Sequence, residues 1–134
     1  PDAKPAARRM VAEVLASAGD ARGRIWVRIN PLAGGLVPDD LAAIMPARPG
    51  GIMLPKSESG ADVVALDGLL KSLENKHNIE GGSTPVHALV TETAAAMFGT
   101  GTYRGAPRLA AMSWGAEDLA DSIGALDNTD AEGR

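Results

Sequence analysis

The stretch "HALVTETAAAMFG", residues 87–99, combines a strand pattern with a helix pattern around a single acidic residue. The apolar run from His87 to Val90 is typical of a buried strand, and the alanine-rich run after it is typical of a buried helix. Glu92 lies between the two runs, and a carboxylate is rarely buried unless it has a partner. The stretch therefore predicts a strand-to-helix connection that carries an acid with a specific purpose.

The same alternation of patterns extends in both directions along the chain. We expect strands at residues 24–30, 51–55, 86–90 and 108–114, and helices at residues 3–18, 37–45, 61–76, 93–99 and 117–125. Helices between consecutive strands predict parallel strands joined by crossover connections, which is an α/β architecture. The continuous apolar strands favour a sheet that is covered on both faces. In the first helix, one apolar stripe is expected to hold Met10, Val11, Val14 and Leu15.

Composition narrows the class of protein. The chain has 134 residues, of which 45% are hydrophobic, so one domain with a sizeable core is expected. Its net charge of -4 argues against a nucleic-acid partner, which would need a basic face. Without cysteine, disulfides and thiolate metal sites are excluded. No apolar run approaches the ~18–20 residues of a membrane span, and a cytoplasmic location is the default expectation.

Ionisable residues follow the carboxyl ends of all four expected strands. They are Arg28, Lys56, Glu92 and Asp118. In parallel α/β folds this edge carries the binding site, because the strand-to-helix loops open there. Each residue also has a structural reading: Arg28 as a surface charge, Lys56 (with Glu58) as part of a solvated loop, and the two acids as first-turn helix charges. For Lys56 we favour that solvated loop, but four such residues at one edge still indicate a polar pocket.

The spacing of the two acids suggests a cation. Glu92 and Asp118 are one strand–helix unit apart, so their carboxylates could converge, and like charges repel unless a proton or cation lies between them. Mg²⁺ commonly takes one or two carboxylates and keeps waters or substrate oxygens. Arg28 nearby could hold a substrate carboxylate in a bidentate grip. These residues predict a site for a small oxo-acid chelated by Mg²⁺.

Four motifs strengthen this hypothesis. They are "WVRINPL" at 26–32, "GIMLPKSES" at 51–59, "ALVTETAAA" at 88–96 and "WGAEDLADSIGA" at 114–125. In this order they resemble the HpcH/HpaI aldolase/citrate lyase family, which includes citrate lyase beta subunits and malyl-CoA and citramalyl-CoA lyases. The similarity extends over nearly the whole chain.

The resemblance implies a TIM (β/α)8 barrel in which residues 1–134 form part of a single catalytic domain. It implies that Glu92 and Asp118 hold Mg²⁺ and that Arg28, together with Glu92, binds the substrate. Backbone amides around Gly115 to Asp118 would also meet the substrate. Trimers or hexamers are common in the family, so a homo-oligomer is expected.

One departure from the family pattern concerns length. A TIM barrel needs eight strands and typically ~250 residues, whereas four strands are expected here. Four barrel strands alone would expose two sheet edges and one face. We therefore expect the sequence to be a fragment of a longer barrel, with the first two strands, the last two strands and any lid missing, and with the proton-transfer group outside it.

The function predicted from residues and resemblance together is that of a Mg²⁺-dependent carbon–carbon lyase. It would cleave or form a 3-hydroxy-acyl-CoA, such as citryl-CoA or malyl-CoA, and its partners are an oxo-acid and an acyl-CoA. Two alternatives stay open. One is a pyruvate-dependent class II aldolase of the same family, and the other is a non-catalytic barrel subunit that keeps the pocket but not the chemistry.

Overall fold

A computed structural model describes residues 3–130 and 132–133. It contains a four-stranded sheet with the order β1-β2-β3-β4, and all three pairings are parallel. The strands are β1 (Trp26–Arg28), β2 (Gly51–Leu54), β3 (Val86–Leu89) and β4 (Leu109–Ser113). Strands that are consecutive in sequence are neighbours in the sheet, as in successive units of a (β/α)8 barrel. The predicted parallel α/β class is confirmed.

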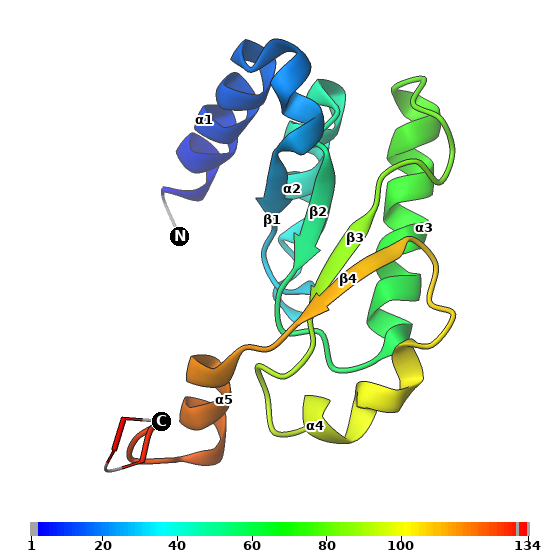
Figure 1. Ribbon diagram of the computed structural model, residues 1–134. Helices are drawn as coiled ribbons and strands as arrows, with labels where there is room; N and C mark the ends of the chain where they lie inside the picture. The colour runs from blue at the N-terminus through cyan, green and yellow to red at the C-terminus, as the bar shows by residue number, and fades with distance from the viewer. Residues whose placement is uncertain (1–2, 131, 134) are drawn as a thin grey trace.

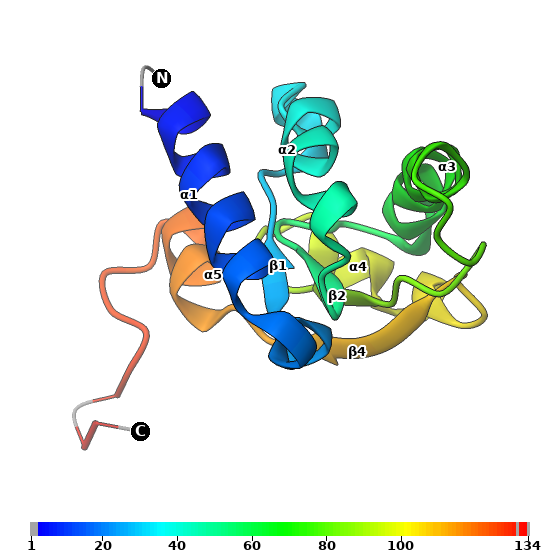
Figure 2. The same ribbon diagram turned by 90° about the horizontal axis from the view of Figure 1, so that it is seen from above.

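Helical segments connect the strands (Figure 1). The α-helices are α1 (Lys4–Ser17), α2 (Val37–Ile44), α3 (Gly60–Lys76), α4 (Ala96–Gly99) and α5 (Ala116–Ile123), and short 3₁₀ segments span Gly19–Arg24, Leu32–Gly34, Met45–Ala47 and Thr100–Tyr103. Figure 2 shows α1, α2 and α3 side by side over one face of the sheet. Within the described residues, none of these helices is long and apolar enough to cross a membrane.

The core lies between that face of the sheet and the helices. Alternate strand residues point into it and have exposed fractions of 9% or less: Val27, Ile29, Ile52, Leu54, Val86, Ala88 and Val90. Helix residues meet them from the other side, among them Leu41, Ile44, Val63, Leu66 and Leu70. Because each fully buried aliphatic side chain is worth about 1.5–3 kcal/mol, this layer dominates the stability of the sheet.

The opposite face of the sheet is open. Trp26 and Arg28 of β1, His87 of β3 and Ser113 of β4 lie on it, and none of them is buried. The imidazole Nε2 of His87 is 2.8 Å from the Ser113 hydroxyl, and the ring meets Trp26 edge-on at 6.3 Å. In a closed barrel this face lines the interior. The expectation of a sheet covered on both faces is therefore wrong for this stretch of chain.

The outer elements also leave apolar side chains exposed. Of the apolar stripe of α1, only Leu15 is buried, while Met10 is 65%, Val11 36% and Val14 58% exposed. At the other edge, Met112 of β4 is 52% exposed and α5 buries no residue completely. These apolar side chains lie where neighbouring barrel units would pack against them.

A buried ion-pair network lies at the amino-terminal ends of β3 and β4. Arg108 donates to Glu74 through both terminal nitrogens, at 2.6 and 2.8 Å, and to Asp67 at 2.5 Å. The Arg108 and Glu74 side chains are 3% and 0% exposed. Burial alone would raise the pKa of Glu74, but hydrogen bonds from Arg108, Gly82 and Thr84 lower it from 4.5 to about 2. The network ties α3 to the residues just before β3 and β4.

Arg108→Met is expected to destabilise the protein by about 3–5 kcal/mol at pH 7, because it leaves buried carboxylates without their partner. The folded-state pKa of Glu74 lies below its ordinary value, so its stabilising contribution is complete above pH 4.5 and is lost as the pH falls towards 2. The cost of the substitution should therefore shrink at pH 3. Urea unfolding at pH 7 and pH 3 measures the loss of unfolding free energy, with the exposed Arg104→Met as a control. An equal loss at both pH values in Arg108→Met would contradict this prediction.

Candidate functional site

The carboxyl ends of the four strands point to one edge of the sheet, on the side of α4 and α5 (Figure 1). Arg28 ends β1, Lys56 follows β2, Glu92 follows β3, and Asp118 lies in the first turn of α5 after β4. The structure brings all four predicted strand-end residues together at this edge. It is the edge at which parallel α/β folds place their binding sites.

Glu92 is the buried member of the group, with an exposed fraction of 3%. One carboxylate oxygen, Oε2, accepts a hydrogen bond of 2.5 Å from the backbone N–H of Lys56. The other, Oε1, lies 3.6 Å from a guanidinium nitrogen of Arg28. The acid in the middle of the 87–99 stretch is thus partnered by groups from the two preceding strands, which explains how it can be buried.

Asp118 completes the group from α5. Its Oδ1 accepts a 2.8 Å hydrogen bond from the ammonium of Lys56, and its side chain is 40% exposed. That hydrogen bond, followed by the contact with the Glu92 carboxyl and the charge of Arg28, lowers the pKa of Asp118. The same hydrogen bond raises the pKa of Lys56. The two carboxylates therefore lie close together, and each is paired with a positively charged side chain: Glu92 with Arg28 and Asp118 with Lys56.

Lys56 is the residue whose role the sequence reasoning missed. The sequence favours a solvated loop, but Lys56 contacts both carboxylates: its backbone N–H donates to Glu92 and its ammonium donates to Asp118. Its backbone adopts the left-handed conformation, with φ of 51°, which is uncommon for residues other than glycine. The signal available in the sequence was its place after β2, at the same edge as the other three. Glu58, which the sequence analysis places in the same solvated loop, is exposed and accepts a hydrogen bond from the Thr93 hydroxyl.

Glu92 is fixed from behind by the loop between β4 and α5. The Thr91 hydroxyl accepts a 2.9 Å hydrogen bond from the backbone N–H of Gly115, which brings the two loops together. A Cβ atom at Gly115 would collide with Cγ of Glu92. A glycine is required at this position because the carboxylate side chain packs directly on the backbone.

Gly115→Ala should displace the Glu92 side chain and weaken Mg²⁺ binding by at least about 10-fold, since removing the support of a metal ligand typically costs 10–100-fold in affinity. Calorimetric titration of Mg²⁺ measures this affinity. The control is Gly68→Ala in α3, where an added Cβ meets nothing within 4 Å. That substitution should leave binding unchanged and stabilise the helix slightly. Equal affinity in both variants would contradict the packing argument.

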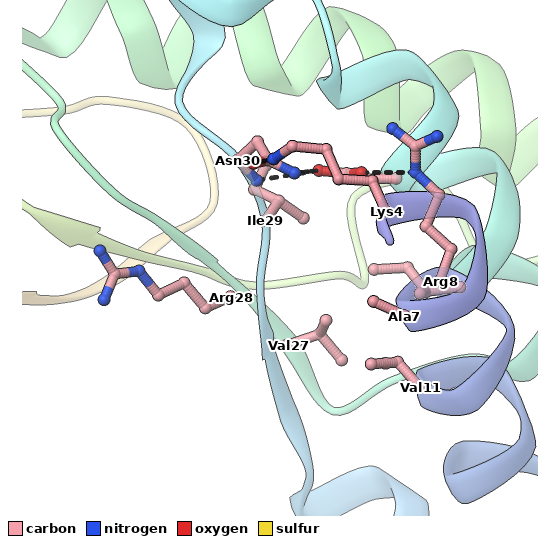
Figure 3. A pocket seen from close by; sticks show the side chains of 10 residues that line it. Lys4, Ala7, Arg8, Val11, Val27, Arg28, Ile29 and Asn30 are labelled. Atoms are coloured by element: carbon pink, nitrogen blue, oxygen red, sulfur yellow. Dashed lines mark hydrogen bonds and ion pairs between the residues drawn. The ribbon is translucent and has the colours of Figure 1, made fainter. Parts of the chain in front are cut away.

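Two of the hollows among the described residues border the loops after the strands. One, of about 310 Å³, opens between the loops after β1, β2 and β3, and its lining includes Lys56, Glu58 and Thr93. The other, of about 200 Å³, lies between α1 and β1. Figure 3 shows Arg28 pointing away from this second hollow, across β1 from Val27. Of the charged group, Lys56 therefore lines the first hollow, whereas Arg28 borders the second with its side chain turned away from it.

The second hollow is bordered by a network that holds the chain just after Arg28. Asp40 accepts hydrogen bonds from the backbone N–H and the side-chain amide of Asn30, at 2.9 and 2.6 Å, and from Arg8 at 2.8 Å. Lys4 donates to the Asn30 amide oxygen at 2.6 Å (Figure 3). The polar groups of this network bind one another, and through Asn30 they hold the chain after β1 in place. We therefore assign the network a role in positioning the end of β1.

The donor set fits a hard divalent cation. Glu92 and Asp118 supply carboxylate oxygens only, which suit Mg²⁺ rather than a softer metal. Within residues 3–130 and 132–133, no group of three or more His, Cys, Asp or Glu side chains could hold a metal ion. A cation here would complete its coordination with waters or substrate oxygens, as Mg²⁺ commonly does.

The fold and this edge define a class: a parallel barrel-type α/β protein with a carboxylate pair and an arginine at the carboxyl ends of its strands. The model of the HpcH/HpaI aldolase/citrate lyase family matches residues 1–132. The chain belongs to this family, and the corresponding four strand–helix units of a TIM (β/α)8 barrel are the fold described above. The resemblance seen in the four motifs is confirmed.

Individual relatives agree with this assignment. The chain is 39% identical over 127 residues to the malyl-CoA/β-methylmalyl-CoA/citramalyl-CoA lyase of Chloroflexus aurantiacus, covering 92% of the chain and 36% of the relative. Two solved structures superpose on it. The citrate lyase beta subunit of Mycobacterium tuberculosis, complexed with oxaloacetate and magnesium, has a TM-score of 0.74 at 31% identity, covering 98% of the chain and 50% of that structure. A citrate lyase of Burkholderia xenovorans has a TM-score of 0.81 at 26% identity, covering 91% and 38%. The chain thus spans less than half the length of the curated relative.

Proposed function

We propose that residues 1–134 form part of a single (β/α)8-barrel catalytic domain of a Mg²⁺-dependent carbon–carbon lyase. It would cleave or form a 3-hydroxy-acyl-CoA, such as malyl-CoA or citryl-CoA, giving an oxo-acid and an acyl-CoA. The observation that carries the proposal is the convergence of Glu92 and Asp118 beside Arg28 at the carboxyl edge of the sheet. The names of the relatives, lyases of malyl-CoA and citrate, supply the substrate class.

In this proposal Glu92 and Asp118 hold the cation, and Mg²⁺ supplies Lewis-acid stabilisation of charge that develops on the oxo oxygen. Arg28, with its side chain 54% exposed, is free to turn from Glu92 to a substrate carboxylate. Its planar guanidinium would orient the oxo-acid through two parallel hydrogen bonds. Glu92, which lies beside Arg28, would contact the substrate as well as the metal.

The proton-transfer group is a separate matter. Within the described residues, Glu92 and Asp118 are engaged with Arg28 and Lys56, and Glu58 is held by Thr93. We therefore propose that the group which moves the proton is supplied from outside these residues, as expected from the sequence. Backbone amides from Gly115 to Asp118, at the start of α5, would meet the substrate's negative charge.

A direct assay separates this proposal from its alternatives. The complete gene product is incubated with Mg²⁺ and either malyl-CoA or citryl-CoA, and the released oxo-acid is measured; a 4-hydroxy-2-oxo acid serves as the parallel substrate. Release of an oxo-acid from a thioester supports the lyase. Pyruvate release from the hydroxy-oxo acid alone would instead indicate a class II aldolase. No turnover of either, with the metal bound, would indicate a non-catalytic subunit. A cytoplasmic location and a homo-oligomer, trimer or hexamer, stay predictions.

A further inference from the structure

The charged group at the carboxyl edge is electrically balanced. Two acids, Glu92 and Asp118, are opposed by two bases, Arg28 and Lys56, and each acid is paired with a different base. A divalent cation that enters this group meets two positive charges as well as two negative ones. Because the formal charges of the four side chains sum to zero, bound Mg²⁺ would give these side chains and the ion together a net charge of about +2.

We propose that Lys56 is a positioning residue that makes metal binding depend on an anionic ligand. Resting on the proposed function, the inference is that its ammonium holds Asp118 until Mg²⁺ enters together with the oxo-acid. The carboxylate of the oxo-acid then supplies negative charge to offset the bound cation, which the four side chains, with a net charge of zero, do not offset. The residue thereby disfavours a site loaded with metal alone.

The placement of Lys56 is built into the backbone. Its N–H is held by the buried Oε2 of Glu92, so the start of its side chain cannot move away. The left-handed φ of 51° is a strained conformation for lysine, and such strain is retained where surrounding structure imposes it. Ser57, which follows, is buried, and its hydroxyl accepts a 2.9 Å hydrogen bond from Tyr103. The loop is thus fixed while the ammonium, on a side chain 41% exposed, is free to leave Asp118.

Electrostatics gives the size of the effect. The ammonium lies 2.8 Å from Asp118 Oδ1, so a cation bound to the same carboxylate is only a few ångströms away. At that range, in a largely solvated and salt-screened site, the repulsion between one positive charge and a divalent cation weakens binding on the order of 10-fold. When an anion is also bound, it compensates this repulsion, so the penalty falls mainly on the metal alone.

The test is calorimetric titration of Mg²⁺ into the complete gene product, with and without saturating oxaloacetate. The variants are Lys56→Met, which removes the charge, Lys56→Arg, which keeps it, and Lys76→Met, an exposed control at the end of α3. In Lys56→Met, Mg²⁺ alone should bind on the order of 10-fold more tightly, and the gain in affinity caused by oxaloacetate should shrink by the same factor. Lys56→Arg and Lys76→Met should behave like the wild type.

Each outcome decides one claim. If Lys56→Met leaves both the affinity for Mg²⁺ alone and the oxaloacetate effect unchanged, or weakens the former, the role of Lys56 is overturned while the metal site stands. If the wild type binds no Mg²⁺ even with oxaloacetate, the proposed function fails and the inference fails with it. Thermal unfolding of each variant, without metal, confirms that the fold is retained; with a side chain 41% exposed, Lys56→Met should not disturb it.

Discussion

Replacing Asp118 by asparagine, or Glu92 by glutamine, is expected to lower Mg²⁺-dependent turnover of the complete gene product on the order of 10³-fold, since several kcal/mol of metal-derived stabilisation are lost. Both substitutions keep the shape of the side chain and remove its charge. Asp118 is 40% exposed, so its replacement should leave folding intact. In Glu92→Gln the amide oxygen can still accept the hydrogen bond from Lys56, which limits the loss of stability.

The matched control for this prediction is Asp121→Asn, an exposed acid on the same helix α5. Its turnover should equal that of the wild type, because its contribution to the site is only a long-range charge. Steady-state rates at several Mg²⁺ concentrations, together with thermal unfolding of each variant, supply the measurement. Wild-type turnover in both Glu92→Gln and Asp118→Asn would refute the assignment of the metal site.

The second large effect is expected at Arg28. Arg28→Met should lower kcat/KM by roughly 10²–10⁴-fold, because two charge-assisted hydrogen bonds to a substrate carboxylate are lost at about 1.5–3 kcal/mol each. Arg28→Lys keeps the charge but not the planar pair of donors and should recover only part of the loss. The ion pair with Glu92, at 3.6 Å and on a side chain 54% exposed, contributes little to stability, so the fold should persist.

Substrate binding separates this role from a structural one. In Arg28→Met the affinity for oxaloacetate should fall, whereas the affinity for Mg²⁺ alone should not, because a positive charge has been removed from its surroundings. The exposed Arg9→Met on α1 is the control. If Arg28→Met binds oxaloacetate as tightly as the control does, the arginine has no part in holding the carboxylate.

Much of this architecture follows from local pattern. The alternation of apolar runs and helix-forming stretches predicts the four parallel strands, and β2 at Gly51–Leu54 and β3 at Val86–Leu89 agree with their expected bounds to within one residue. The convergence of Glu92 and Asp118 follows because parallel strands end at the same edge. Such features depend on residues close in sequence, or on topology alone, and can therefore be read without coordinates.

Other features depend on packing between residues far apart in the sequence, and the pattern of a single sequence does not predict them. The exposed Met10 and Val14 of α1 have the same apolar pattern as a buried stripe, and only the residues that pack against a helix in space distinguish the two. For Lys56 the sequence favours a solvated position, because a lysine in a Ser- and Glu-containing loop is usually solvated. Its bonds to Glu92 and Asp118 span 36 and 62 residues, which no local pattern predicts.

The buried network around Arg108 shows an intermediate case. Glu74 follows Leu66 and Leu70 at intervals of four residues, so it lies on the buried face of α3. An acid at that position of an apolar stripe indicates a buried partner. The sequence therefore held a signal for the network, but not the identity of the partner, since Arg108 is 34 residues away.

The most direct test of the central claim is a calorimetric titration of Mg²⁺ into the complete gene product with oxaloacetate present, repeated with Glu92→Gln and Asp118→Asn. The account predicts binding of one Mg²⁺ per chain in the wild type, and its loss or severe weakening in each variant, with all three proteins folded. Binding that persists unchanged in both variants, or no binding in the folded wild type, would contradict the account.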